Sequence, residues 1–159
     1  PLSDENLPID NQRLMDIELE FSDIIIACFW GNTYHDQIKL VYNWTNGMVN
    51  YIAGSLGYNF HNPSFKLFEY DSRNFEILNY FHFNLDSNLQ FSNPNFLGFN
   101  LASNARKNFN IYDLHWRTWY NLAVNMTQND DLFNKYCLTY NAGYEKTCDK
   151  SLICDIIKC

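Results

Sequence analysis

A short polar stretch that follows an apolar run contains the residues whose types could do chemistry. Residues 31–36 read Gly-Asn-Thr-Tyr-His-Asp and come directly after the apolar residues 24–30. The chemistry to consider there is metal ligation. Asn32 offers only a carbonyl oxygen, which is a weak ligand, and a neutral Tyr34 is a poor ligand for zinc. His35 lies next to them, but a shift of one residue along a strand points a side chain to the opposite face, so we interpret it as a surface histidine.

No other set of residues in the sequence has an order typical of a catalytic site. There is no Ser-His-Asp or Cys-His arrangement and no glycine-rich phosphate loop. The tripeptide 113–115 spells Asp-x-His, but it leads into a predicted amphipathic helix. His61 falls in a predicted loop and His82 in a predicted strand, where we expect hydrogen-bonded structural roles. The sequence therefore predicts no catalytic residue and no cofactor.

The composition is that of one compact acidic domain. The chain has 159 residues, of which 47% are hydrophobic, and its 11 Lys and Arg against 18 Asp and Glu give a formal net charge of −7. A nucleic-acid binder needs a basic face to neutralise phosphates, and this chain has no cluster of basic residues. No apolar run approaches the ~20 residues that cross a bilayer, so we expect no transmembrane segment.

Four of the five cysteines are gathered in the last 23 residues. Their spacings lack the paired Cys-x-x-Cys units of structural zinc sites, so we interpret them as a disulfide-stabilised end, for which three pairings are open. These disulfide candidates are Cys137, Cys148, Cys154 and Cys159. Cys28 lies inside the apolar run and is expected to be a reduced, buried small hydrophobe.

Glycosylation signals and the cysteines favour an oxidising compartment. Asn43 and Asn125 each begin an Asn-x-Thr acceptor sequence. We therefore expect a secreted, lysosomal or other lumenal glycoprotein. The chain begins at Pro1 without a methionine or a signal peptide, so we expect that the numbering describes a processed piece.

Apolar periodicity predicts about five strands, followed by helices. The run 23–30 is rich in β-branched residues and is typical of a strand that is buried on both faces. Residues 35–42 alternate as a half-buried strand does, and Asn46-Gly47 is a turn signal before a further strand at 48–53. Two more strands, at 65–71 and 75–83, are joined by a turn at 71–74.

The second half changes from strand to helix patterns. Residues 86–100 contain turn residues and are predicted to form a loop. Three- and four-residue spacing of apolar residues from Trp116 to Met126 predicts an amphipathic helix. A second helix, capped by Asp130 or Asp131, ends near Gly143.

The expected fold class is α+β, with mostly antiparallel strands and a helical, cystine-rich end. We divide the chain into a linker or loop at 1–12, a β-rich part at 13–100 and a helical subdomain at 101–159.

The polar stretch resembles the last metal-binding motif of the calcineurin-like metallophosphoesterases, Gly-His-x-His. The similarity extends from about residue 13 to 159, to the C-terminal part of acid sphingomyelinase and the acid sphingomyelinase-like phosphodiesterases. In that family the motif typically reads Gly-His-Thr-His, then a variable residue and an aspartate. The segments that carry the rest of the resemblance are 62–65 (Asn-Pro-Ser-Phe), 68–71 (Phe-Glu-Tyr-Asp), 119–126 (Trp-Tyr-Asn-Leu-Ala-Val-Asn-Met) and 132–136 (Leu-Phe-Asn-Lys-Tyr).

The resemblance implies a part of a metallophosphoesterase-like β-sandwich, a fold whose enzymes use two metals to hydrolyse phosphodiesters. Here Asn32 and Tyr34 occupy the positions of the two metal-binding histidines. The remaining family motifs lie upstream of the region that this chain covers. We therefore expect a pseudoenzyme, a non-catalytic remnant that is a structural or binding component of a larger assembly. The alternative is a C-terminal fragment of a zinc-dependent sphingomyelin or nucleotide phosphodiesterase that a missing N-terminal part completes. A third hypothesis is an unrelated secreted domain.

A partner is also expected. Because residues 23–29 are apolar on both faces, both faces of that predicted strand need a cover. About five strands and two or three helices cover one face and leave part of the other open. The N-terminal portion, another subunit or a larger assembly would supply the cover, and no nucleic-acid partner is expected.

Overall fold

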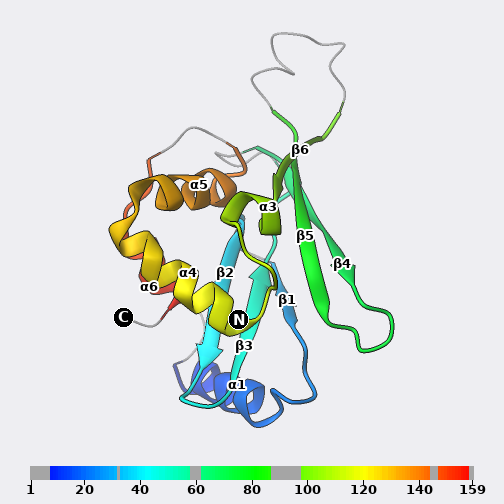
Figure 1. Cartoon of the computed structure of the whole chain (residues 1–159), viewed down its shortest axis with the longest axis vertical. Coiled ribbons are helices and arrows are strands. Elements are labelled where there is room, and N and C mark those ends of the chain that lie inside the picture. The colour runs from blue at the N-terminus through cyan, green and yellow to red at the C-terminus, as the bar shows by residue number, and fades with distance from the viewer. Residues whose placement is uncertain (1–7, 32, 58–61, 87–97, 144–146, 158–159) are drawn as a thin grey trace.

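Two small sheets and a group of helices make up the computed structural model, which describes residues 8–31, 33–57, 62–86, 98–143 and 147–157 (Figure 1). The first sheet contains β1 (Cys28–Trp30), β2 (Gln37–Tyr42) and β3 (Gly47–Ile52) in the order β1-β3-β2. The second sheet contains β4 (Ser64–Tyr70), β5 (Ile77–Asn84) and β6 (Asn100–Asn104) in chain order. All neighbours pair antiparallel except β1 and β3. The expected α+β class with mostly antiparallel strands is confirmed.

The β2–β3 hairpin forms where the Asn-Gly signal predicts it. The backbone N–H of Asn43 donates to the carbonyl of Asn46 at 2.8 Å and closes the turn. The indole ring of Trp116 lies against the Cα of Gly47 so closely that a Cβ there would collide with it. Glycine is therefore needed at this position to let the first residue of α4 pack on the hairpin.

Helices follow the second sheet: α3 (Ala105–Phe109), α4 (Trp116–Gln128), α5 (Asp130–Tyr140) and α6 (Ser151–Ile156). The predicted stripe of α4 is buried, namely Trp119, Leu122, Ala123 and Met126. The side chain of Asn129, rather than that of Asp130 or Asp131, caps α5 by accepting from the N–H of Leu132 at 3.0 Å. An amide oxygen one residue earlier satisfies the same free N–H groups, and the two aspartates then lie in the first turn, where the helix dipole favours them.

The core lies between the helices and the inner faces of both sheets. Trp119 of α4 is nearly parallel to Tyr80 of β5, with ring centroids 6.2 Å apart. Tyr80 also meets Tyr51 of β3 edge to face at 6.0 Å. Because one ring from each sheet and one from a helix meet here, the aromatic residues join all three layers. No described helix is long and apolar enough to span a membrane.

The end of α5 is held by two buried asparagines. The side-chain amides of Asn62 and Asn84 both donate to the carbonyl of Ala142, at 3.1 and 2.6 Å. Gly143 follows with a φ of 76°. Its N–H donates to Leu138 at 2.7 Å, which is the usual way for a helix to end at a glycine. The predicted end near Gly143 is therefore explained by a contact between α5 and the second sheet.

Three predictions about element boundaries need correction. Helix α1 (Pro8–Glu20) begins inside the range 1–12 that was expected to be a linker, and proline is tolerated there because the first helical turn needs no N–H donor. Strand β6 lies partly beyond and partly inside the loop predicted at 86–100, because pairing with β5 compensates for its weak apolar pattern. The run 23–30 forms only the three-residue strand β1, which lies at the sheet edge.

The predicted double burial of that run is also wrong for this chain. Ile24 is 71% exposed and Phe29 is 54% exposed. Only one edge of β1 pairs with a described strand. The apolar residues that predicted a central strand therefore form an exposed surface here.

The expectation of a disulfide in the cysteine-rich end is confirmed. Cys137 in α5 is bonded to Cys148, 11 residues later. Cys154 is also disulfide-bonded, whereas Cys159 lies outside the described residues. Cys28 is a free thiol. Burial, and then the nearby Glu18 carboxylate, raise the pKa of this thiol to about 11, so it stays protonated and unreactive at neutral pH.

Removing the Cys137–Cys148 disulfide with paired Cys→Ala substitutions should lower the free energy of unfolding by about 2–3 kcal/mol, because a short loop loses its closure in the unfolded chain. Chemical denaturation followed by circular dichroism measures this change, and hydrogen exchange should show α5 and α6 opening before the sheets. The matched control is Cys28→Ala, which removes a thiol but no crosslink. An unchanged denaturation midpoint would contradict the assignment, and so would five free thiols in the native protein.

Candidate functional site

The polar stretch that was considered for metal ligation lies in the connection between β1 and β2. Asn32 lies outside the described residues, and Tyr34 is exposed with a φ of 65°, a conformation that non-glycine residues seldom adopt. His35 is half-buried rather than fully at the surface, because its ring stacks on Tyr140 with centroids 4.3 Å apart. Within the described part of the chain, no three His, Cys, Asp or Glu side chains are grouped so that they could hold a metal ion.

The last residue of that stretch forms a buried ion pair. Asp36 Oδ1 lies 2.6 Å from Lys66 Nζ, and both side chains are only 2% exposed. Asp36 directly precedes β2 in the first sheet, whereas Lys66 lies in β4 of the second sheet. A buried charge is tolerated only with a partner, so this ion pair ties the two sheets together.

Lys66 has two further contacts. Its ammonium group donates to the carbonyl of Ile52, at the end of β3, at 3.1 Å. It also lies 4.9 Å from the centre of the Tyr80 ring, within the range of a cation–π contact. The ammonium group is therefore held by a carboxylate, a carbonyl and an aromatic face, and it is not available to an external ligand.

His82 completes this cluster from β5. It is fully buried, and its Nε2 lies 3.4 Å from Asp36 Oδ2. Burial lowers the pKa of His82, while the Asp36 carboxylate acts in the opposite direction and the Lys66 ammonium group adds to the lowering. The strand position of His82 is as predicted, but neither ring nitrogen has a hydrogen-bond partner among the described residues.

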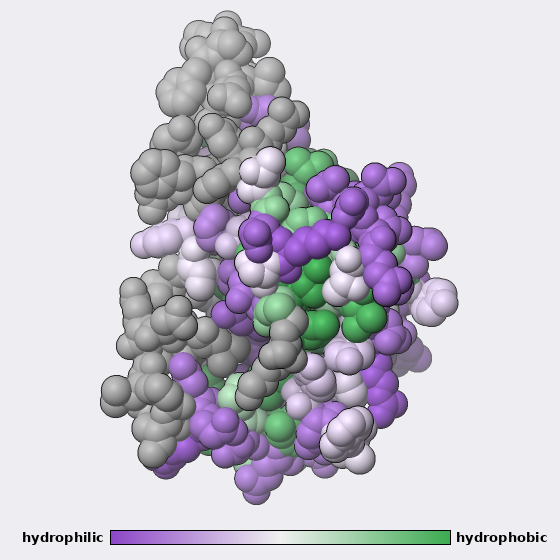
Figure 2. Space-filling model, turned by 90° about the vertical axis from the view of Figure 1, so that its left-hand side faces the viewer, coloured by the Kyte–Doolittle hydropathy of each residue, from purple (hydrophilic) through white to green (hydrophobic). Residues whose placement is uncertain are grey.

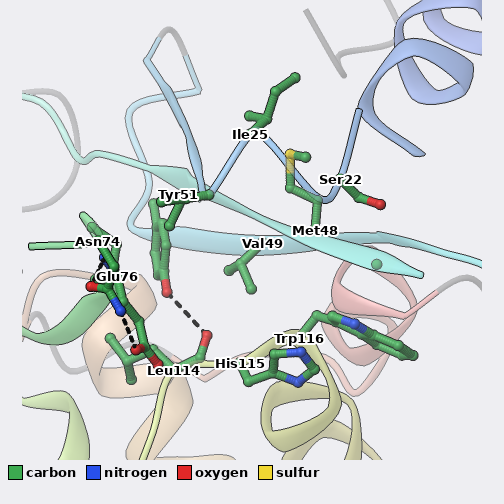
Figure 3. Close-up of a pocket in the computed structure, with 13 residues that line it drawn as sticks. Ser22, Ile25, Met48, Val49, Tyr51, Asn74, Glu76, Leu114, His115 and Trp116 are labelled. Atoms are coloured by element: carbon green, nitrogen blue, oxygen red, sulfur yellow. Dashed lines mark hydrogen bonds between the residues drawn. The ribbon is translucent and has the colours of Figure 1, made fainter. Parts of the chain in front are cut away.

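The cavity in Figure 3 has polar groups that the fold already uses. It has a volume of about 320 Å³ and lies between residues 22–26, β3, the β4–β5 turn and the start of α4. The Tyr51 hydroxyl donates to the Leu114 carbonyl at 3.4 Å, and Asn74 donates to Glu76 at 3.4 Å. His115 Nδ1 accepts from the N–H of Arg117 at 3.3 Å and caps α4. These contacts are structural, and they do not pair a nucleophile with a base.

The Asp-x-His sequence at 113–115 has a structural role at the start of α4. Asp113 Oδ1 accepts from the N–H of His115 at 3.0 Å and from the hydroxyl of Thr118 at 2.6 Å. Both contacts hold the first turn of α4. This segment is therefore a helix cap, as its place before an amphipathic helix indicates.

A second, more apolar groove lies between the β1 region and the β4–β5 hairpin. It has a volume of about 550 Å³ and is lined entirely by Ile24, Ile26, Ala27, Phe29, Phe68, Tyr70, Phe75 and Ile77. Phe29 meets Phe68 edge to face with centroids 4.8 Å apart. We call this surface the β1 groove. The side of the molecule that carries α4–α6 also shows apolar side chains among polar ones (Figure 2).

The two glycosylation candidates are accessible. Asn43 is exposed in the β2–β3 turn, where its side-chain oxygen accepts from the N–H of Thr45 at 2.9 Å. Asn125 is exposed on α4.

Sequence reasoning missed the ion pair and one further buried acid. Glu18 of α1 is almost fully buried and accepts from the Asn50 amide at 2.8 Å, and burial raises its pKa. The only signal for Lys66 is a lysine between Phe65 and Leu67, and such a lysine usually faces solvent. Partners that are 30 or more residues apart cannot be read from local periodicity.

Asp36→Asn should lower the free energy of unfolding by about 3–5 kcal/mol, because it leaves the Lys66 charge buried without a counter-charge. Lys66→Met should have a similar effect, and the double variant should lose less than the sum of the two. A double-mutant cycle in urea measures this coupling.

The exposed pair Asp130–Lys150, with the same 2.6 Å separation, is the matched control. Asp130→Asn should cost at most about 1 kcal/mol, because water screens that pair. If Asp36→Asn costs no more than Asp130→Asn, the ion pair does not join the sheets.

Comparisons with known proteins agree with the resemblance in the sequence. The model of the acid sphingomyelin phosphodiesterase C-terminal region matches residues 43–159. The chain is 30% identical over 140 residues to sphingomyelin phosphodiesterase A from Dictyostelium discoideum, which covers 83% of this chain and 24% of that protein. It is also 30% identical over 157 residues to a cyclic GMP-AMP phosphodiesterase from Bos taurus, covering 91% of this chain and 33% of that protein.

The chain thus spans about a quarter to a third of the length of these relatives. The matches overturn the hypothesis of an unrelated secreted domain. Because the family model covers most of the sequence, the chain belongs to the family of acid sphingomyelin phosphodiesterase C-terminal regions.

Proposed function

We propose that this chain is a non-catalytic C-terminal unit of an acid sphingomyelinase-like phosphodiesterase and is a structural component of a larger assembly. The observation that carries the proposal is the β1 groove, which an N-terminal portion of the kind found in the longer relatives would cover. In this role the chain supplies no metal ligand and no catalytic group.

The groove has the features of a covered surface. Its lining is mostly apolar, and large exposed apolar patches on soluble proteins mark interaction sites. Beside it, β1 pairs with a described strand on one edge only, and an unpaired strand edge can accept a strand from a partner. The relatives are three to four times as long as the matched region, and this leaves enough chain for such a partner.

The residues at the motif positions support the lack of catalysis. The sequence has Asn32 and Tyr34 where the family has histidines, and these are weak or poor zinc ligands. The aspartate of the motif, Asp36, is used in the ion pair with Lys66. The part of the motif that supports the fold is thus present, while the part that would hold a metal has changed.

The same proposal includes a lumenal or extracellular location. A disulfide such as Cys137–Cys148 persists in an oxidising compartment, and both acceptor asparagines are exposed. Glycosylation at Asn43 and Asn125 is part of this proposal.

The alternative function is a zinc-dependent phosphodiesterase that the N-terminal portion completes. The names of the relatives, a sphingomyelin phosphodiesterase and a cyclic GMP-AMP phosphodiesterase, are the observation in its favour.

The first test concerns the groove. The isolated chain should self-associate above its mass of 18.9 kDa in sedimentation velocity and should bind a hydrophobic dye. Ile24→Lys and Phe75→Asn should reduce both effects at unchanged stability, because these residues are 71% and 63% exposed and asparagine tolerates the φ of 62° at position 75. Tyr112→Asn is the control, since Tyr112 is 82% exposed and is not among the groove residues. A monomer that binds no dye would contradict the proposed cover.

The second test separates the two functions. In a chimera, this chain replaces the matching region of the Dictyostelium relative. We expect the chimera to fold and to hydrolyse no sphingomyelin, and the chain alone to retain less than one zinc per molecule after dialysis. Asn32→His with Tyr34→His should raise both zinc content and hydrolysis, whereas Asn43→His with Tyr112→His should raise neither. Hydrolysis by the unmodified chimera would establish the alternative.

A further inference from the structure

A third cavity, which neither the motif nor the β1 groove includes, lies beside His82. It has a volume of about 260 Å³ and is formed by β5, β6, α3, α5 and Gly143. Its polar lining comes from His82, Ser103, Asn108, Lys135 and Thr139. None of its described lining residues is an Asp or Glu, although the chain carries 18 of them. The cavity is therefore locally rich in donors within an acidic protein.

The side chains around the cavity leave donors available. The Asn108 amide gives one hydrogen to Ser103 Oγ at 3.0 Å and has a second hydrogen left. Lys135 is exposed at the cavity and brings the one fixed positive charge among the described lining residues. Thr139 donates to the Lys135 carbonyl at 3.2 Å, and this contact fixes the turn of α5 that carries both residues.

His82 is the group in the cavity wall that the fold leaves incompletely satisfied. Its side chain is fully buried, and its Nδ1 has no hydrogen-bond partner among the described residues. Its Nε2 lies 3.4 Å from Asp36 Oδ2, so the neutral ring places its proton best on Nε2. A buried ring nitrogen without a partner is uncommon in proteins and calls for an explanation. Nδ1 is an acceptor in the neutral ring, and it becomes a donor for an anion oxygen only when the ring is doubly protonated.

We propose that this cavity binds a small oxyanion, of the phosphate or sulfate class, through His82, Lys135 and the Ser103–Asn108 pair. The anion takes donors from the ammonium group of Lys135, from the Asn108 amide and from Nδ1–H of the doubly protonated imidazole. Asp36 balances the charge of that imidazolium from the opposite side of the ring.

Binding should be linked to a proton. The charged groups that face His82 are Asp36 before β2, Lys66 on β4 and Lys135 on α5. Without the anion, burial keeps the pKa of His82 below its usual value, so the ring is neutral at neutral pH. The bound anion favours the imidazolium, so affinity should rise as the pH falls from 7.5 and should level off once the free protein is itself protonated.

Sulfate is the probe, because its charge is constant over this pH range. Calorimetric titration of the full chain, with sodium chloride balancing the ionic strength, should give at least fivefold tighter binding at pH 5.5 than at pH 7.5. The ring nitrogen resonances of His82 should show its pKa rising when sulfate is added. In a further experiment, phosphatidylcholine vesicles that contain phosphatidic acid compete with sulfate for the protein. Displacement of sulfate would assign the site to a lipid headgroup, and no displacement would assign it to a free anion.

Variants separate the site from general electrostatics. Lys135→Gln should weaken sulfate binding at least fivefold at unchanged stability, because the side chain is exposed. Lys107→Gln, which removes an exposed lysine of α3 that does not line the cavity, should have no effect. His82→Gln should remove the pH dependence of sulfate binding. If His82→Gln does not fold, the pH profile of the wild-type protein and the sulfate affinity of Lys135→Gln test the proposal instead. The proposal would be overturned if the protein bound no sulfate at millimolar concentration, or if Lys135→Gln and Lys107→Gln lost sulfate affinity equally. A sulfate affinity that did not change with pH would also overturn it.

Discussion

The buried ion pair between Asp36 and Lys66 is the constraint on which the arrangement of the two sheets depends. The sheets share no hydrogen-bonded strand pair in the described structure, so side chains must set their relative position. Aromatic contacts such as that of Tyr51 with Tyr80 pack the sheets together, but ring packing tolerates small shifts. An ion pair at 2.6 Å with both side chains buried does not tolerate such shifts. A slip of β4 by one residue would move Lys66 to the other face and leave Asp36 unpaired.

This constraint gives the polar stretch after β1 two separable roles. Its early positions, 32 and 34, are those that the resemblance in the sequence aligns with metal ligands, and its last position holds the sheets together. Tyr34 is exposed, so a change there costs the fold little, whereas Asp36 is buried against Lys66 and His82. A chain can therefore lose the ligands and keep the fold. This is consistent with a sequence that has Asn32 and Tyr34 and still matches the family model over residues 43–159.

The sequence was most informative where one element buries one face. The β2–β3 hairpin and α4 follow their periodicity because alternation and three- to four-residue spacing record which residues face the core. Prediction was weaker where the structure depends on pairing with another strand, or on the lack of a neighbouring strand. Strand β6, Asn-Leu-Ala-Ser-Asn, has little apolar pattern and exists through its pairing with β5. Residues 23–27 have a strand composition but no neighbour to pair with in the described structure. The cluster of Asp36, Lys66 and His82 could not be predicted, because its members lie just before β2, in β4 and in β5, and no local signal links them.

The β1 groove and the His82 cavity differ in the kind of partner they require. The groove lining is apolar, so its occupation is favoured by removal of surface from water, roughly 25 cal/mol for each Å². That contribution changes little with pH, and it suits a permanent contact within a larger protein. The cavity offers a buried imidazole, a lysine and an amide, whose attraction for an anion changes with the protonation of one ring. The two surfaces have no lining residue in common, so a partner in the groove does not occupy the residues that would hold the anion. Both surfaces include residues of the second sheet, where Phe68 in the groove and His82 at the cavity lie on the paired strands β4 and β5.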